Sequence, residues 1–168
     1  MNSKDFFQKV DRNSKLYEEF RNKANEKLQE DKFKEANKEW EEFFVSSHGA
    51  IFERLQLEEP RKELFIDSLY FDYIVDGIIK HCQDEFGFNL RNIEPKTNTK
   101  AISFSFGSLH SEILEPEKAK ELSRESFDKE LLLNYDVDFL RKLYENIISR
   151  EMRLELGEYY TPQGVAEL

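Results

Sequence analysis

A dense apolar stretch in the middle of the chain reads Leu64-Phe65-Ile66-Asp67-Ser68-Leu69-Tyr70-Phe71-Asp72-Tyr73-Ile74. A stripe at helical spacing runs through it and beyond: Ile66, Tyr70, Tyr73, Ile74, Ile78 and Cys82, widened by Leu64, Phe65 and Leu69. Apolar residues that recur every three to four positions line one face of an α-helix. Pro60 suits its first residue, and Gly87 suits the position just after its end. We therefore predict a long helix here and expect it to be the most buried of the fold.

Two more apolar stripes lie in the first 57 residues. The first comprises Phe6, Val10, Tyr17, Phe20, Ala24 and Leu28, and the second comprises Phe33, Ala36, Trp40, Phe43, Phe44, Ile51 and Leu55. Their spacing predicts two amphipathic helices, with Ser3 as the N-cap of the first. The joint Gln29-Glu30-Asp31-Lys32 is polar and has neither Gly nor Pro, so a helical hairpin and one bent helix are both compatible with it.

Helical spacing returns in the last third of the chain. We predict a helix from about Glu115-Pro116-Glu117, followed by another that is capped by Asp136 or Asp138. The inward-facing residues are Ala119, Leu122 and Phe127 in the first and Val137, Leu140, Tyr144, Ile147 and Ile148 in the second. We expect the second helix, or its extension, to end at Gly157.

The segment between these helical regions, residues 88–115, is rich in loop-forming residues. Within it, Ala101-Ile102-Ser103-Phe104-Ser105-Phe106 alternates apolar and polar side chains, as a short strand does. The whole chain has only six Gly and four Pro, which favours long helices over a turn-rich β fold. The predicted fold is mostly α: a helical bundle of five to six helices with one irregular loop or short strand in the middle.

Charge and cysteine content narrow the class of protein. The net charge is −10, and a chain this acidic is a poor DNA binder on its own because phosphate contacts need a basic face. The single cysteine, Cys82, excludes an intramolecular disulfide. Because the sequence has neither a signal-peptide pattern nor a long apolar run, we expect a cytoplasmic protein with no membrane partner.

The C-terminal residues carry the most specific pattern: Gly157-Glu158-Tyr159-Tyr160-Thr161-Pro162-Gln163-Gly164-Val165-Ala166-Glu167-Leu168. Pro162 restricts Thr161 to an extended conformation and suits the first position of a helix, while the Thr161 hydroxyl can cap that helix. The N-terminus of a helix offers free N–H groups and a partial positive charge. This turn is therefore suited to hold a ligand carboxylate.

Together with Leu143-Tyr144-Glu145 and Arg153 upstream, this turn resembles the start of the catalytic part of restriction-modification DNA adenine methyltransferases, either type I methylation subunits or fused type II enzymes. The match covers residues 137–168. The resemblance implies S-adenosylmethionine as cofactor, with its methionine end near the turn. The cofactor-proximal residues that it implies are Glu158, Tyr159, Tyr160, Thr161, Pro162 and Gln163.

The sequence departs from that family in what it lacks. It has no Gly-rich cofactor loop after a strand, and no Asn-Pro-Pro-Tyr or Asp-Pro-Pro-Tyr motif for the target amino group. We therefore expect an N-terminal helical domain over residues 1–134 and, over 135–168, a lead-in to a methyltransferase domain. The first part would position DNA, a neighbouring domain, or a specificity or restriction subunit, and the chain alone would be inactive. The alternative is a free-standing, non-catalytic helical interaction module.

Other candidate sites are weaker. Asp76 and Asp84 followed by Glu94-Pro95-Lys96 formally fit a metal-dependent nuclease, but a proline inside the triplet disfavours the strand that such a site needs. His81 next to Cys82 suggests a base and a nucleophile, yet adjacent helical residues point to different faces, which favours a structural histidine.

Two further features can be interpreted either as functional or as merely structural. The three histidines are far apart and lack zinc-ligand spacing, so we predict no metal site. Arg91, Lys96 and Lys100 form a locally basic loop that could touch a DNA backbone in the full enzyme, although a solvated loop is the simpler interpretation.

Overall fold

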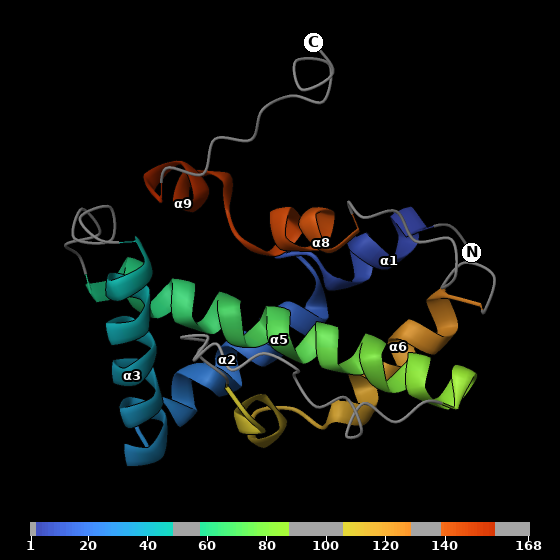
Figure 1. Cartoon of the computed structure of the whole chain (residues 1–168), viewed down its shortest axis with the longest axis horizontal. Helices are drawn as coiled ribbons and strands as arrows, with labels where there is room; N and C mark the ends of the chain where they lie inside the picture. Colours follow the sequence, from blue (N-terminus) through green and yellow to red (C-terminus); the bar gives the residue numbers. More distant parts are fainter. Residues whose placement is uncertain (1–2, 49–57, 88–105, 129–138, 157–168) are drawn as a thin grey trace, which may run out of the picture.

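The computed structural model describes residues 3–48, 58–87, 106–128 and 139–156 (Figure 1). These residues are arranged as helices joined by turns, and they contain no strand. The elements are α1 Ser3–Val10, α2 Lys15–Lys27, α3 Asp31–His48, α5 Glu58–Phe86, the 3-10 helix η2 Leu109–Glu112, α6 Pro116–Ser126, α8 Phe139–Ile147 and α9 Arg150–Glu155. The predicted mostly α fold is confirmed.

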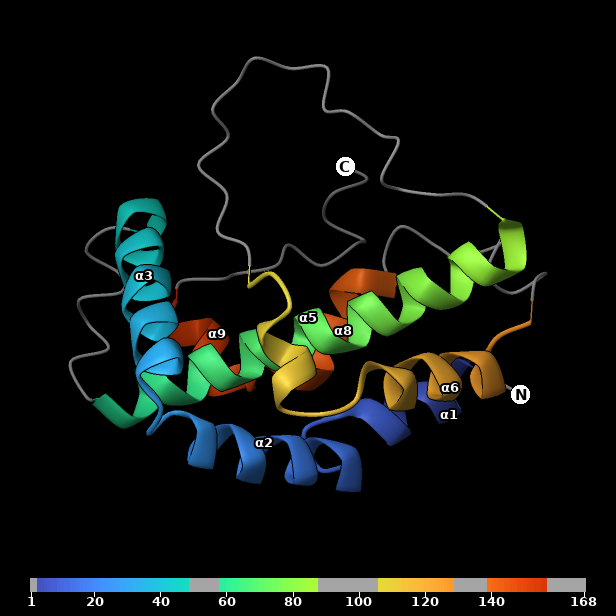
Figure 2. The same ribbon diagram turned by 90° about the horizontal axis from the view of Figure 1, so that it is seen from below.

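The long helix α5 is the centre of the structure, as its apolar stripe predicted. It carries more buried apolar side chains than any other described helix, among them Leu64, Phe65, Ile66, Leu69, Tyr70, Tyr73 and Ile74. The helices α2 and α6 lie along one side of it, and α3 stands across its N-terminal end (Figure 2). Gly87 ends α5 in the left-handed conformation (φ 67°), and its N–H donates to the Gln83 carbonyl over 2.9 Å. Burying this stripe on several sides holds the bundle together.

The N-terminal region differs from the prediction, because the expected first helix is two helices. The chain breaks between Val10 and Lys15, where short polar side chains bond to the backbone. Asp11 Oδ1 accepts the Asn13 N–H over 2.9 Å, and Ser14 Oγ accepts the Tyr17 N–H over 3.1 Å as the N-cap of α2. Such bonds compete with a continuous helix. All six residues of the predicted stripe are nevertheless buried, so α1 and α2 both face the core.

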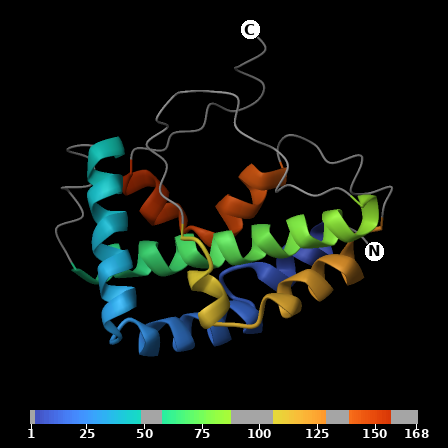
Figure 3. The ribbon, with the colours of Figure 1, turned by 60° about the horizontal axis from the view of Figure 1, so that its bottom comes forward.

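The polar joint after α2 separates two helices that are neither a hairpin nor one bent helix. Helix α2 ends at Lys27, α3 begins at Asp31, and α3 leaves at a steep angle (Figures 2 and 3). Phe33 and Trp40 are buried, and the Trp40 ring lies 5.6 Å from that of Phe65 on α5. The apolar face of α3 therefore packs on the end of α5 instead of along α2.

Helix α6 lies so close to α5 that the contact needs a glycine. A Cβ added to Gly77 would lie 2.5 Å from the Cβ of Ala119 and 2.7 Å from its carbonyl carbon. Pro116 occupies the first turn of α6, as predicted, and Ala119 and Phe127 are buried while Leu122 is half-buried. The α5–α6 pair is thus fixed by the close approach of small residues at the crossing.

The predicted inward face of the next helix was wrong at one position. Leu140 is 51 % exposed, whereas Phe139, Leu143 and Ile147, spaced four apart, are buried. Phe139 begins the helix on the core side, so Leu140, about 100° further round, faces outward. The helix itself ends at Ile147, and Ser149 caps a separate helix, α9, that runs to Glu155; Gly157, the predicted end of the helix or its extension, lies outside the described residues.

Several predictions lie outside the described residues. These are residues 101–105 of the strand predicted at 101–106, the caps Asp136 and Asp138, the residues Ile51, Leu55 and Val137, and the boundary at 134–135. The last residue of that segment, Phe106, is described and is not part of a strand. Of the middle segment, residues 106–115 form a turn at Gly107 (φ 58°) and the 3-10 helix, held by buried Leu109, Ile113 and Leu114. Within the four described ranges, no helix combines the length and apolar character that a membrane span requires.

Candidate functional site

The structure describes the lead-in to the predicted cofactor segment but not the segment itself. Gly157 and the cofactor-proximal residues Glu158, Tyr159, Tyr160, Thr161, Pro162 and Gln163 lie outside the described residues. The lead-in residues Leu143, Tyr144, Glu145 and Arg153 are described, on α8 and α9. These two helices lie on the side of α5 opposite α2 and α6 (Figure 3).

The residues Leu143 and Tyr144 attach α8 to the core. Leu143 is fully buried, and the half-buried Tyr144 ring makes an edge contact with Phe71 of α5, with centroids 5.9 Å apart. Burying a leucine side chain contributes about 1.5–3 kcal/mol. Helix α8 is therefore held against the central helix by two of the residues that carry the resemblance.

The residues Glu145 and Arg153 join α9 to α8. Ser149 Oγ accepts the Met152 N–H over 3.1 Å as the N-cap of α9, and buried Met152 and Leu156 attach the short helix to the core. An Arg153 guanidinium nitrogen lies 4.0 Å from Glu145 Oε1, with the Arg153 side chain 16 % exposed. The structure thus brings all four lead-in residues into one α8–α9 unit.

A buried ionic cluster lies between α5 and the turn that joins α1 to α2. The fully buried Asp67 accepts a hydrogen bond from Arg12 Nη1 over 2.7 Å and from the Tyr17 hydroxyl over 2.5 Å. Arg12 also pairs with Glu63 one turn earlier, and its guanidinium carbon lies 5.8 Å from the Tyr17 ring centroid. The cluster ties the turn between α1 and α2 to the middle of α5.

Burial dominates the electrostatics of this cluster. Removal from water raises the pKa of Asp67 above its ordinary range, although the Arg12 guanidinium and the Tyr17 hydroxyl both act to lower it. The same burial, reinforced by the neighbouring Asp67 carboxyl, raises the pKa of Tyr17. Tyr17 is therefore a hydrogen-bond donor at every physiological pH.

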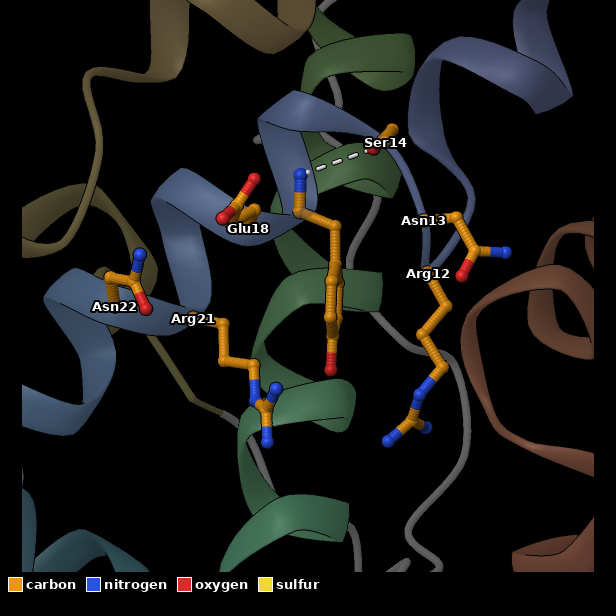
Figure 4. A pocket seen from close by; sticks show the side chains of 7 residues that line it. Arg12, Asn13, Ser14, Glu18, Arg21 and Asn22 are labelled. Carbon is orange, nitrogen blue, oxygen red and sulfur yellow. Dashed lines mark hydrogen bonds between the residues drawn. The ribbon is translucent and has the colours of Figure 1, made fainter.

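An open cavity of about 320 Å³ lies next to the cluster, at the start of α2. It is lined by Arg12, Asn13, Ser14, Tyr17, Glu18, Arg21 and Asn22. The guanidinium groups of Arg12 and Arg21 extend to the same end of it (Figure 4). Its lining can donate hydrogen bonds to a polar group, but Glu63 and Asp67 already engage Arg12, so the cavity has little free positive charge.

Sequence reasoning missed this cluster. Tyr17 was assigned to the core only, and neither Arg12 nor Asp67 was singled out. One signal was available: Asp67 is one of only two acids, with Asp72, inside the most apolar stretch, and it lies next to Ile66 of the buried stripe. A charge in such a position is rarely buried without a partner.

His81 and His110 occupy structural positions. His81 is buried, and its Nδ1 lies 2.9 Å from Ser123 Oγ on α6. Burial lowers the pKa of His81 and raises that of the Cys82 thiol, which disfavours a charged pair. Buried His110 places Nε2 3.5 Å from Asp72 Oδ2, which joins η2 to α5.

Of the predicted nuclease and DNA-loop residues, the structure describes only Asp76 and Asp84. Glu94, Pro95, Lys96, Arg91 and Lys100 lie outside the described residues.

The two acids of that pattern have structural partners instead. Asp76 pairs with Lys80 over 2.6 Å, and Asp84 pairs with Lys120 and Arg124 of α6 over 2.9 and 3.1 Å. Across the described part of the chain, no three His, Cys, Asp or Glu side chains are placed so that they could hold a metal ion.

Comparison with known proteins adds no relative. No family model matches the chain, and neither a curated protein nor a solved structure matches it. The function must therefore be argued from the residues and their geometry.

Proposed function

We propose that this chain is the N-terminal helical part of a restriction-modification enzyme that methylates adenine in DNA with S-adenosylmethionine. The observation that carries the proposal is the phrase Leu143-Tyr144-Glu145, Arg153 and Gly157–Pro162. Its described members support it, because they form one unit in which Glu145 and Arg153 join α9 to α8, which packs on α5.

In this proposal the chain contributes binding and positioning. Residues 1–134 position DNA, a neighbouring domain, or a specificity or restriction subunit, and Glu158–Gln163 form the edge of the cofactor pocket. S-adenosylmethionine supplies the methyl group when bound. In this proposal Pro162 would begin a helix capped by the Thr161 hydroxyl, and the free N–H groups at its start would bind the ligand carboxylate. The residues that transfer the methyl group belong to the rest of the enzyme, whose proposed compartment is the cytoplasm.

Substitution of Thr161 tests this proposal through cofactor binding. We expect Thr161→Ala to weaken the binding of S-adenosylmethionine about tenfold, because losing a helix cap costs about 1 kcal/mol and also disturbs the ligand's own site. The protein is to be captured with an antibody against this chain after expression from its own gene. Dissociation constants would then be measured by equilibrium binding of labelled S-adenosylmethionine.

The control is Leu154→Ala, which changes a side chain on α9 that is 44 % exposed and should leave the affinity unchanged. If the unsubstituted protein does not bind S-adenosylmethionine, the proposal is wrong. A free-standing helical interaction module would then be the better reading, and a search for protein partners would replace the cofactor assays.

A further inference from the structure

Arg12 connects three elements that are far apart in the sequence. Its main-chain N–H donates to the carbonyl of Asn146 over 3.1 Å. Asn146 is the last but one residue of α8, which ends at Ile147. The last four carbonyls of a helix have no partner within the helix. The turn between α1 and α2 therefore supplies a partner to the C-terminal end of α8.

The side chain of Arg12 fixes the direction of this main-chain donor. Its guanidinium bonds the buried Asp67 and also pairs with Glu63, and both acids are on the rigid central helix. Tyr17 donates to the second oxygen of Asp67, so the carboxyl is held from two sides. A planar guanidinium that bonds two acids on one helix is restrained in position as well as charge. Arg12 thus binds α5 with its side chain and α8 with its main chain.

We propose that Arg12 is a positioning residue that sets where α8 ends on α5, and so where α9 begins. The chain leaves α9 towards the residues proposed to form the edge of the cofactor pocket, so this consequence rests on the proposed function. We call the contacts among Arg12, Asp67, Glu63 and Asn146 the clasp, and its existence does not depend on the proposed function. If it holds the α8–α9 turn, opening it must loosen that turn without unfolding the bundle.

Amide hydrogen exchange in the full chain tests the clasp directly. In Arg12→Met the amide at position 12 remains but its anchor is lost. We expect exchange at that amide, and at the amides of residues 148–152, to become about tenfold faster, as the loss of one or two ordinary hydrogen bonds predicts. Arg12→Lys should restore protection in part, because it keeps the charge but not the two-pronged geometry.

A matched control is available in Arg21→Met. Arg21 lines the same cavity and is 51 % exposed, with its guanidinium 4.0 Å from Glu63, so its removal should leave exchange at position 12 and in residues 148–152 unchanged. Equal acceleration in both arginine variants would overturn the proposal, because it would reflect general charge loss. Unchanged exchange in Arg12→Met would overturn it as well.

Two further measurements separate the clasp from stability and from the proposed function. Because Arg12→Met leaves the buried Asp67 without its partner and so destabilises the chain, the triple variant Arg12→Met/Tyr17→Phe/Asp67→Leu also replaces Asp67 and its second donor by apolar side chains. Faster amide exchange at the α8–α9 turn of the triple variant, with an unchanged urea midpoint, supports positioning, and exchange as slow as in the unsubstituted chain refutes it.

In the antibody-captured protein, the triple variant should bind S-adenosylmethionine about tenfold more weakly. If the unsubstituted protein does not bind it, the proposed function fails, while the exchange result still decides the clasp.

Discussion

The substitution Phe127→Ala is expected to lower the free energy of unfolding by about 3–5 kcal/mol, the usual cost of removing a buried phenylalanine. Phe127 is 2 % exposed at the end of α6. Its ring centroid lies 4.5 Å from that of Phe6 on α1 and 5.8 Å from that of Phe139 on α8. The Phe127 ring therefore joins α6 to α1 and α8, and its truncation leaves a cavity where the three helices meet.

The comparison with Phe7→Ala makes the test specific. Phe7 also contacts Phe6 and Phe139, with centroids 6.0 and 5.3 Å apart, but it is only half-buried. Its truncation should cost less than half as much, because less apolar area returns to water. Urea unfolding followed by circular dichroism measures both values. Equal costs, or a cost below about 1 kcal/mol for Phe127→Ala, would contradict the packing described for α1, α6 and α8.

The substitution Asp67→Ala is expected to cost about 3 kcal/mol at neutral pH, because it leaves the buried Tyr17 hydroxyl without an acceptor and breaks the pair with Arg12. Replacing the donor and the acceptor together, in Tyr17→Phe/Asp67→Leu, should cost no more than about 1 kcal/mol. Urea unfolding of the two variants checks this ordering. A double variant less stable than Asp67→Ala would show that the cluster is not the source of the cost.

The pH dependence of the same site has a definite sign. Burial raises the pKa of Asp67 in the folded chain above the ordinary value of about 3.9, so the native state binds more protons than the unfolded state in this range. Stability from this group is therefore greatest at low pH and falls as pH rises from about 4 through the folded pKa. Relative to the unsubstituted chain, Asp67→Asn should thus gain stability between pH 4 and pH 7. A difference that is constant over this range would contradict the raised pKa.

Hydrophobic periodicity predicted the helices well where a single face is buried. The stripe from Leu64 to Ile74 is buried in α5, and the first stripe from Phe6 to Leu28 is buried although the chain breaks inside it. The break was missed because periodicity does not register a turn that keeps the same face inward. The Asp11 and Ser14 side chains that cause it show their effect only through their bonds to the backbone.

Prediction from the sequence failed where contacts between helices determine which residues are buried or paired. Leu140 is as apolar as Leu143, and only the position of α8 on α5 decides which of them is buried. Gly77 gives no sign in the sequence that α6 approaches it closely. The Arg12–Asp67 pair joins residues 55 positions apart, which spacing alone cannot reveal. The proposed role of Glu158–Gln163 in cofactor binding rests on their sequence, since they lie outside the described residues.

Methyl transfer by the protein from its source cells is the most direct measurement. The protein would be captured with an antibody against residues 1–168, then incubated with duplex DNA and S-adenosylmethionine labelled in its methyl group. We expect label on the amino nitrogen of adenine, and its loss when Thr161→Ala is expressed in place of the natural chain. Unlabelled DNA, together with no detectable binding of S-adenosylmethionine, would contradict the proposal that this chain belongs to a DNA adenine methyltransferase.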